Sequence, residues 1–310
     1  MISVVVPVYR CSTTLSELHQ RLVSTMQRLS QTYELILVND ASPDDAWQVM
    51  KKLVDADTNV RAINLSRNFG QHYAITAGLQ YARGELVVIM DGDLQDQPEE
   101  ISKLYQALTP ELAAVLGRRQ IRRDDFAKKF SSRCFYFCLS YLTDTKLDPA
   151  IANFGIYRRK LIDAVLAMPE QIRFFPLMVR WVGFKTTTIN IDHAERNAGK
   201  SSYSLGKLLR LAFDVITAFS DKPLRLTMKI GAIISCGAFV YALYILMRVA
   251  LGLSLIPGWA SVIVSIWFLA GLVIMLLGMI GVYIGRIFDQ VKHRPLYVVD
   301  TIYERDKMRL

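Results

Sequence analysis

This 310-residue chain contains only four cysteines, and their spacing does not suggest that they act together. Cys11 and Cys236 stand alone. Cys134 and Cys138 have the spacing of one helix face, but no further metal-ligating residues stand near them. This arrangement excludes a disulfide framework and offers no metal site, so we expect the cysteines to pack in the core of a protein in a reducing, cytosolic compartment.

Other signals are also missing. Residues 1–7 have no basic segment and no small-residue cleavage site, so we expect a first strand there rather than a secretory leader. Basic and aromatic residues are not combined in a nucleic-acid-binding module, which argues against a nucleic-acid partner despite the net charge of +9. The positive charge favours phosphates, nucleotides or an anionic lipid surface instead.

The first 120 residues do show a regular alternation of strand-like and helix-like segments. Runs of β-branched and aliphatic residues predict strands at 2–8, 34–40, 60–65, 86–90 and 113–116. Amphipathic or capped segments predict helices at 12–29, from 42 onwards, at 71–82 and from 98 onwards. Such alternation indicates an α/β fold, a mostly parallel, Rossmann-like sheet covered by helices.

The strand expected at 86–90 ends in Asp91-Gly92-Asp93-Leu94-Gln95-Asp96. Because side chains alternate along a strand, Asp91 and Asp93 should point the same way at its carboxyl end, where open α/β sheets bind ligands. Two such carboxylates suit a hard divalent cation that also takes oxygens from a phosphorylated substrate. An acidic turn without a metal is the alternative, and an EF-hand is excluded because Asp96 stands where that loop needs glycine.

Charged residues also follow other expected strands. Asp40 follows the second strand, Arg67 the third and Arg119 the fifth. Since the carboxyl ends of parallel strands meet at one edge of the sheet, we expect these residues to form one site with the acidic pair.

With 52% hydrophobic residues, the chain is too apolar for an ordinary soluble enzyme, and two long apolar runs explain why. Residues 230–251 would span about 33 Å as a helix, enough for a hydrocarbon core of about 30 Å. Residues 262–284 form a second, uncharged run, and the short connector between them predicts a transmembrane hairpin. Lys and Arg flank both outer ends, so the positive-inside rule places both termini in the cytoplasm.

These patterns predict four parts: a cytosolic α/β domain (1–203), an amphipathic juxtamembrane helix and linker (204–228), two transmembrane helices (229–286), and a cytosolic tail (287–310). The aromatic and basic residues of 125–141 suit either a membrane surface or ordinary core packing. The Gly281-x-x-x-Gly285 face leaves a homo-oligomer open, although packing within the hairpin would explain it equally well.

Several short motifs occur in order over nearly the whole chain. They are Val6-Pro7-Val8-Tyr9, Val38-Asn39-Asp40-Ala41-Ser42, Arg67-Asn68-Phe69-Gly70-Gln71-His72, Asp91-Gly92-Asp93-Leu94-Gln95-Asp96, Glu195-Arg196, Gly199-Lys200-Ser201-Ser202-Tyr203 and Pro223-Leu224-Arg225. Together they resemble family 2 glycosyltransferases of the GT-A fold. The resemblance is to their membrane-anchored polyprenyl-phosphate branch, which includes bactoprenol glucosyltransferases, undecaprenyl-phosphate formamido-arabinose transferases and dolichyl-phosphate mannose synthases.

The resemblance implies roles for individual residues. The nucleotide of the donor would contact Pro7, Tyr9, Asp40, Arg67 and Asp91, with Asp40 accepting a hydrogen bond from the base, expected to be uracil. Mg²⁺ or Mn²⁺ would be held by Asp91, Asp93 and Gln95. Phosphates of donor and acceptor would be bound by Arg119, Lys128, Ser132, Arg196, Lys200, Ser201 and Tyr203.

By the same resemblance, the reaction is an inverting, metal-dependent transfer of a sugar from a UDP-sugar to undecaprenyl phosphate. It would occur at the cytoplasmic face of a bacterial inner membrane and serve modification of the cell envelope. Asp93 and Asn153 would be the catalytic residues. Several relatives have an Asp where this chain has Asn153. An amide is no general base, but a phosphate monoester with a second pKa of about 6 is largely dianionic at neutral pH, so we expect Asn153 to orient the acceptor.

Two other functions remain open. A processive polysaccharide synthase would carry Gln-x-x-Arg-Trp, and here Leu177 replaces the Gln before Arg180-Trp181. A hairpin of two helices is also too small for a polymer channel. A catalytically silent membrane scaffold of the same fold is favoured by Asn153 but opposed by the intact acidic set and the cationic loop.

Overall fold

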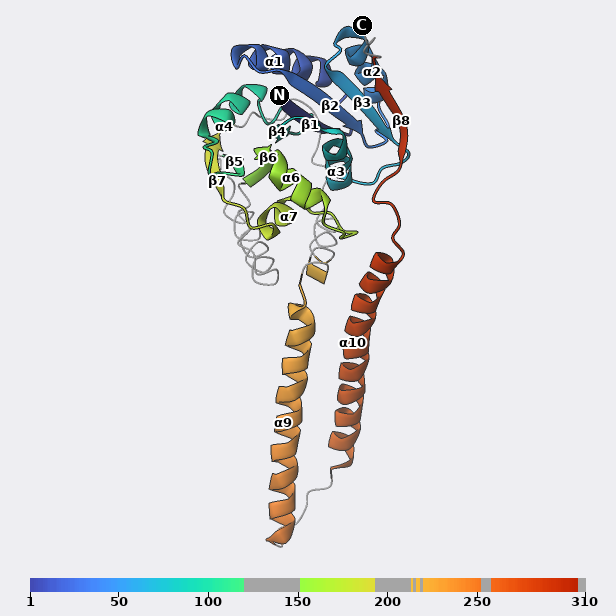
Figure 1. The fold of residues 1–310 in the computed structure, drawn as a ribbon. Helices are drawn as coiled ribbons and strands as arrows, with labels where there is room; N and C mark the ends of the chain where they lie inside the picture. Colours follow the sequence, from blue (N-terminus) through green and yellow to red (C-terminus); the bar gives the residue numbers. More distant parts are fainter. Residues whose placement is uncertain (120–150, 193–212, 214–215, 218–219, 252–257, 306–310) are drawn as a thin grey trace. The chain divides into compact units, whose positions relative to one another are not determined.

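The computed structural model describes residues 1–119, 151–192, 213, 216, 217, 220–251 and 258–305 (Figure 1). Its elements, in chain order, are β1 (Ile2–Val8), α1 (Leu15–Arg28), β2 (Tyr33–Asn39), α2 (Ala46–Ala56), β3 (Val60–Leu65), α3 (Gln71–Tyr81), β4 (Leu86–Ile89), the 3₁₀ helix η1 (Pro98–Glu100), α4 (Ile101–Ala107), β5 (Ala114–Arg119), β6 (Ile151–Arg158), α6 (Arg159–Leu166), α7 (Phe175–Trp181), β7 (Thr186–Ile191), α9 (Lys222–Ala250), α10 (Trp259–Val291) and β8 (Val299–Glu304).

The chain divides into two compact units. The first consists of Met1–Phe137, Thr145–Ser204 and Pro295–Leu310, and the second of Cys138–Asp144 and Leu205–Arg294. The last residues therefore belong with the first ones, although the two long helices α9 and α10 separate them in the sequence.

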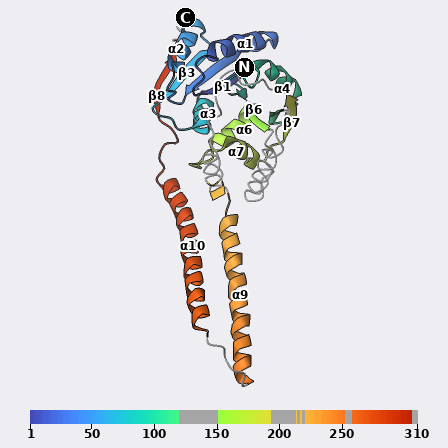
Figure 2. The same cartoon turned by 180° about the vertical axis from the view of Figure 1, so that it is seen from behind.

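One eight-stranded sheet, ordered β7-β5-β6-β4-β1-β2-β3-β8, organises the first unit (Figures 1 and 2). Strands β1 to β4 run parallel to one another, as the alternating sequence pattern predicts. β6 is antiparallel to both β4 and β5, and β8 is antiparallel to β3, so the sheet is mixed. The expected α/β fold is confirmed, although the two antiparallel strands β6 and β8 were not expected from the sequence pattern.

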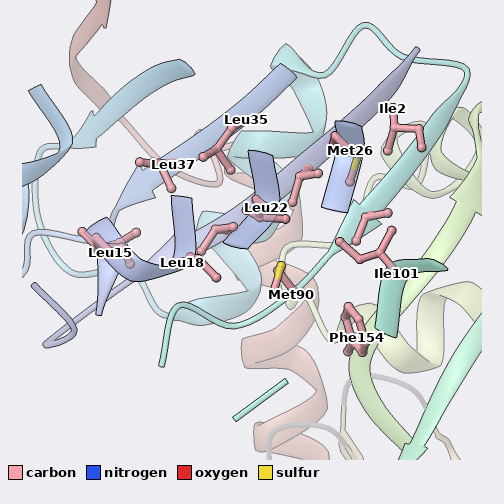
Figure 3. Close-up of a cluster of buried hydrophobic side chains, with 14 of the residues drawn as sticks. Ile2, Leu15, Leu18, Leu22, Met26, Leu35, Leu37, Met90, Ile101 and Phe154 are labelled. Atoms are coloured by element: carbon pink, nitrogen blue, oxygen red, sulfur yellow. The ribbon is translucent and has the colours of Figure 1, made fainter. Parts of the chain in front are cut away.

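The core follows from side-chain alternation along β1. Ile2, Val4, Val6 and Val8 are fully buried and belong to the same cluster as the apolar face of α1. That face consists of Leu15, Leu18, Leu22 and Met26, which recur at helical spacing (Figure 3). Burying each side chain of this size contributes roughly 1.5–3 kcal/mol, so this layer fixes the position of the central strand.

The opposite face of β1 packs against α3. Val5 points to Gly78 of that helix, and a Cβ at Gly78 would overlap the Val5 side chain and lie 3.1 Å from Cγ2 of Val38. Only glycine lets the helix backbone approach the sheet this closely. This close contact fixes α3 against β1 and β2.

The second unit contains the two long apolar helices. Near the end of α10, the Tyr283 hydroxyl donates to the Ser220 carbonyl (2.8 Å), and Nε of Arg286 donates to Oγ1 of Thr217 (3.1 Å). Because both partners precede α9, the helices form an antiparallel hairpin. Both are long and apolar enough to cross a membrane, and α10 continues to Val291, beyond the expected limit of 286.

Residues after the hairpin contribute to the sheet. β8 pairs antiparallel with β3. An ion pair between Nε of Arg61 and Glu304 (2.7 Å) also joins the two strands, and the Ser66 N–H donates to the Val298 carbonyl just before β8. The segment expected as a simple cytosolic tail thus covers the open edge of β3. A paired edge cannot recruit strands from other chains.

Candidate active site at the strand ends

The carboxyl ends of three neighbouring strands converge in the first unit. Val8 of β1 is in register with Asn39 of β2, and the Asp40 N–H donates to the Val8 carbonyl (3.0 Å). On the other side of β1, the Met90 N–H donates to the Val5 carbonyl (3.2 Å), which leads β4 into Asp91. The expected gathering of polar groups at one edge of the sheet is therefore present for the residues that follow β1, β2 and β4.

The turns after these three strands share an uncommon backbone conformation. Arg10, Ala41 and Leu94 have φ angles of 56°, 47° and 61°, in the left-handed region that residues with a Cβ seldom adopt. One such residue follows each of β1, β2 and β4. Backbone strain of this kind persists where surrounding contacts enforce it, and it is concentrated at ligand sites.

The turn with the acidic pair is held from two helices. Nε2 of Gln71, the first residue of α3, donates to Oδ1 of Asp91 at 2.7 Å. Oγ1 of Thr14, just before α1, lies 2.5 Å from the Gly92 carbonyl, and the Gln95 N–H donates to Oδ1 of Asp93 at 3.2 Å. These contacts fix the direction in which the two carboxylates point.

Accessible and buried residues alternate along this turn, so that one side of it is open to a ligand. Asp91, Asp93 and Gln95 are partly accessible, whereas Gly92, Leu94 and Asp96 are buried. A Cβ at Gly92 would lie 3.0 Å from Sγ of Cys11, so the backbone packs closely underneath. The three residues expected to hold a metal therefore share the accessible side.

Cys11 lies beneath the acidic pair but has no nucleophilic role. Burial, together with the negative charges of Asp44, Asp93 and Asp91, raises the pKa of its thiol to about 12. The thiol is therefore protonated at neutral pH, and only a thiolate would act as nucleophile or metal ligand. As expected from the sequence, Cys11 packs in the core, but the same expectation is wrong for Cys236 of α9, which is exposed.

The chemistry of the donor atoms fits a hard divalent cation. Carboxylates of Asp91 and Asp93 and the amide oxygen of Gln95 are the oxygen ligands that Mg²⁺ and Mn²⁺ take. No group of three or more His, Cys, Asp or Glu side chains that could hold a metal occurs within the described ranges. Such an acidic pair leaves coordination positions for water and for a phosphorylated substrate, as Mg²⁺ sites commonly do.

The Asp40 carboxylate binds two backbone N–H groups of the protein. It is 3% exposed, and its two carboxylate oxygens accept the N–H groups of Phe69 (2.7 Å) and Gly70 (2.9 Å). Burial raises its pKa, while these two bonds and the charge of Arg67 oppose that shift. Asp40 thus anchors the loop that begins α3, in which Gly70 has φ 109°. The expected contact of Asp40 with a base remains a prediction.

Tyr9 and Arg67, two other predicted nucleotide-binding residues, are both exposed. Tyr9 lies beside Arg10, and Arg67 lies beside the ring of Phe69. The Arg10 guanidinium lies 5.5 Å from the ring centre of Tyr9, and that of Arg67 lies 4.2 Å from the ring of Phe69. Pro7 stands within β1 opposite Val38. An exposed aromatic ring next to guanidinium groups is suited to stacking a base near phosphates.

Asn153 belongs to β6, which the sequence pattern did not predict. Val87 pairs with Tyr157 and Ile89 with Gly155, and this pairing ends two residues before Asp91 and two residues after Asn153. The Tyr157 hydroxyl also donates to the Asn153 carbonyl (3.3 Å), which steadies this part of the strand. Asn153 thus lies on the strand next to β4, and its catalytic role remains a prediction.

Most of the predicted phosphate-binding residues lie outside the part of the chain that the structure describes. Arg119 ends β5, paired with Ile191 of β7, but its side chain lies outside the described atoms. The others, which are Lys128, Ser132, Arg196, Lys200, Ser201 and Tyr203, lie outside the described residues. Their assignment remains a prediction.

Gln71 and Thr14 hold the acidic turn but were not among the predicted site residues. A polar residue directly after Gly70, at the start of an expected helix, was an available signal for Gln71. Thr14 had no comparable signal, because its contact with Gly92 joins residues 78 positions apart.

Comparison with known proteins agrees with this geometry. The model of the family described as "Glycosyl transferase family 2" matches residues 3–166, which include every described residue of the acidic site. The chain belongs to glycosyltransferase family 2. It is a glycosyltransferase with a GT-A domain, which confirms the resemblance found in the sequence.

Relatives match over nearly the full length of the family 2 chain. An uncharacterized glycosyltransferase of Bacillus subtilis, YkcC, is 39% identical over 309 residues, covering 99% of this chain and 96% of that protein. The undecaprenyl-phosphate 4-deoxy-4-formamido-L-arabinose transferase of Proteus mirabilis is 35% identical over 304 residues, covering 97% and 93%. A solved structure, glucosyl-3-phosphoglycerate synthase from Mycobacterium tuberculosis, is 17% identical with a TM-score of 0.49, covering 70% of this chain and 76% of that one.

Proposed function

We propose that this glycosyltransferase transfers a sugar from a UDP-sugar to a polyprenyl phosphate, with undecaprenyl phosphate as the acceptor. The observation that carries the proposal is the acidic pair, held at the strand ends by Gln71, in a chain that also has two exposed apolar helices. The Proteus mirabilis relative, whose name specifies undecaprenyl phosphate, supports this class of acceptor.

The donor half of the reaction requires stabilisation of a leaving diphosphate. Asp91, Asp93 and Gln95 would hold Mg²⁺ or Mn²⁺, which supplies positive charge against the diphosphate as the glycosidic bond breaks. Arg67 and Arg10, both exposed at the same edge of the sheet, add fixed positive charge for the phosphates. Tyr9 provides an exposed ring for the base.

The acceptor half needs no strong base. A polyprenyl phosphate carries a nucleophilic oxygen that is largely deprotonated at neutral pH, because its second pKa is about 6. Asn153 lies on β6, the strand next to β4, and its amide would donate a hydrogen bond that orients this phosphate. Direct attack from the face opposite the leaving diphosphate would invert the anomeric centre.

We further propose that α9 and α10 span the inner membrane of a bacterium, with the catalytic unit and both termini in the cytoplasm. Lys222, Arg225 and Lys229 at the start of α9, and Arg286, Lys292 and Arg294 around the end of α10, provide the supporting charge asymmetry. A membrane location would keep the enzyme in the same plane as its water-insoluble acceptor.

The test is a transfer assay with a panel of radiolabelled UDP-sugars, membranes that contain the enzyme, and added undecaprenyl phosphate. We expect one sugar to appear in a lipid product. Asp93→Ala should lower the rate at least about 100-fold, the size of effect seen when a key electrostatic group is removed. Asp163→Asn, an exposed carboxylate on α6, is the matched control and should retain the wild-type rate.

Either of two results would contradict the proposal: full activity in excess chelator, or wild-type transfer by Asp93→Ala. The alternative that Asn153 favours, a silent scaffold of the same fold, predicts neither transfer to lipid nor hydrolysis of any UDP-sugar by the wild type. The same assay therefore separates the two functions.

A further inference from the structure

A line of polar side chains crosses three strands of the sheet and reaches the turns of the candidate active site. It starts on β8, where Oδ2 of Asp300 accepts from Nδ2 of Asn64 on β3 (3.1 Å). Oδ1 of Asn64 accepts from Nδ2 of Asn39 on β2 (2.7 Å), and Oδ1 of Asn39 accepts the N–H of Ser42 (3.1 Å). None of these contacts belongs to the regular hydrogen bonding of the sheet.

Both ends of this line fix its direction. The Ser42 N–H can only donate, so it must meet the oxygen of the Asn39 amide. The Asp300 carboxylate can only accept, so it must meet the NH₂ group of Asn64. The two amides between them are thereby oriented head to tail, and the negative charge of Asp300 strengthens the bond at its end.

A β-bulge aims Asp300 at this position. Along β3 and β8, Asn64 pairs with Thr301, but Leu65 pairs with Val299, so Asp300 is an extra residue on β8. Bulges of this kind redirect a side chain and are frequent beside active sites. The Thr301 hydroxyl also donates to Oδ2 of Asp300 (2.9 Å) and helps to hold the carboxylate in place.

Beyond Ser42 the line divides among the turns that follow β1 and β2. The Ser42 hydroxyl donates to Oδ1 of Asp44 (2.5 Å) and accepts the Arg10 N–H (2.7 Å), while Oδ2 of Asp44 accepts the Ser12 N–H (3.0 Å). Arg10 and Ala41 are the two left-handed residues of these turns. The polar line therefore ends on the strained backbone that carries Tyr9 and follows Asp40.

We infer that Asn64 and Asp300 are positioning residues of the donor site: through Asn39 and Ser42 they hold the turns that would bind the nucleotide. The C-terminal strand is then a working part of the site and more than a cover for the edge of the sheet. The inference rests on the proposed function for its ligand, a uridine nucleotide.

Exchanging the amide at position 64 and the carboxylate at position 300 tests this inference in the full-length protein. Asn64→Asp alone sets two carboxylates against each other, at positions 64 and 300. We expect it to raise the Kd for UDP, measured by calorimetry with Mg²⁺, by roughly 5- to 30-fold, the range for residues coupled in one network. The donor KM should rise in parallel, while kcat at saturating donor stays within about twofold, because a positioning defect weakens donor binding.

The double variant Asn64→Asp/Asp300→Asn restores a donor opposite an acceptor, since the new amide at position 300 can donate to the new carboxylate at position 64. We expect its Kd for UDP to return to within about threefold of wild type. Glu304→Gln is the matched control on β8, because it removes the ion pair with Arg61 but leaves the polar line intact. It should lower the thermal midpoint without changing the Kd for UDP.

Three outcomes overturn the inference: an unchanged Kd in Asn64→Asp, no recovery in the double variant, or an equal loss in Glu304→Gln. Each would leave the proposed function standing if the wild type still binds UDP and transfers sugar. Conversely, the expected order of UDP affinities without any transfer to lipid would support the inference and reject the proposed acceptor.

Discussion

The two units use the same apolar residue types in opposite ways. In β1, Val4, Val5 and Val6 are fully buried, whereas Ile274 and Leu277 of α10 are 69% and 62% exposed. A domain in water gains stability by removing such side chains from solvent, and the first unit has such a core. In the second unit, no apolar side chain within the described residues is buried. The high hydrophobic content of the chain is thus the sum of one ordinary domain and one hairpin that needs an apolar surrounding.

The strongest test of this contrast places a charge on the exposed apolar surface. Leu277→Arg should cost roughly 3 kcal/mol for insertion of α10 into a bilayer, because a charge near the centre of a span must be desolvated. We expect a large fall in the share of protein that resists alkaline extraction from membranes. Gln27→Arg, at an exposed position of α1, is the control and should extract like wild type. Equal retention of wild type and Leu277→Arg would mean that α10 faces water.

A second test compares glycines from the two units. A Cβ at Gly78 would overlap Val5, whereas a Cβ at Gly271 of α10 would have nothing within 4 Å. Gly78→Ala should destabilise the first unit by about 1–3 kcal/mol through overpacking, despite the better helix propensity of alanine. Gly271→Ala should be neutral or stabilising by up to about 1 kcal/mol. Urea unfolding in detergent micelles measures both, and similar losses in the two variants would contradict the difference in packing.

The smallest effect concerns the surface of the first unit. Arg21 binds Glu99 through two bonds, from Nε to Oε1 (2.9 Å) and from Nη2 to Oε2 (2.7 Å), and these bonds lower the pKa of Glu99. A carboxyl whose pKa is lower in the folded state stabilises the fold above its unfolded pKa, and this stability is lost as the pH falls through the lowered value.

Glu99→Gln should therefore cost about 0.5–1 kcal/mol at pH 7, a value reduced by solvent screening, and almost nothing in strong acid. Urea unfolding at several pH values measures this difference. Glu111→Gln, at an exposed position of the same unit, is the control and should leave the stability unchanged. A loss that is the same at every pH would show that Glu99 contributes by packing.

Regular local patterns made much of this architecture predictable. The parallel strands β1 to β4 each coincide with an apolar run, and the acidic turn after β4 could be recognised because strand alternation alone puts Asp91 and Asp93 on one side. The hairpin was predictable from length and hydrophobicity. Such features depend only on residues close together in the sequence.

The misses all depend on contacts between distant segments. β8 has a mostly exposed face, so its residues carry no apolar alternation, and its place beside β3 is set by pairs such as Arg61 with Glu304, 243 positions apart. The anchoring of Phe69 and Gly70 by Asp40 was equally hidden, because a carboxylate after a strand looks the same whether it binds a ligand or its own backbone.

The place of β8 in the sheet also has a consequence for biosynthesis. A ribosome makes β3 well before β8, because both apolar helices lie between them in the chain. The edge of β3 therefore stays unpaired with β8 while the hairpin is made, and Asn64 can meet Asp300 only after the hairpin has been synthesised. Contacts of such long sequence separation form slowly, so the docking of β8 onto β3 should be a late step in the folding of this enzyme.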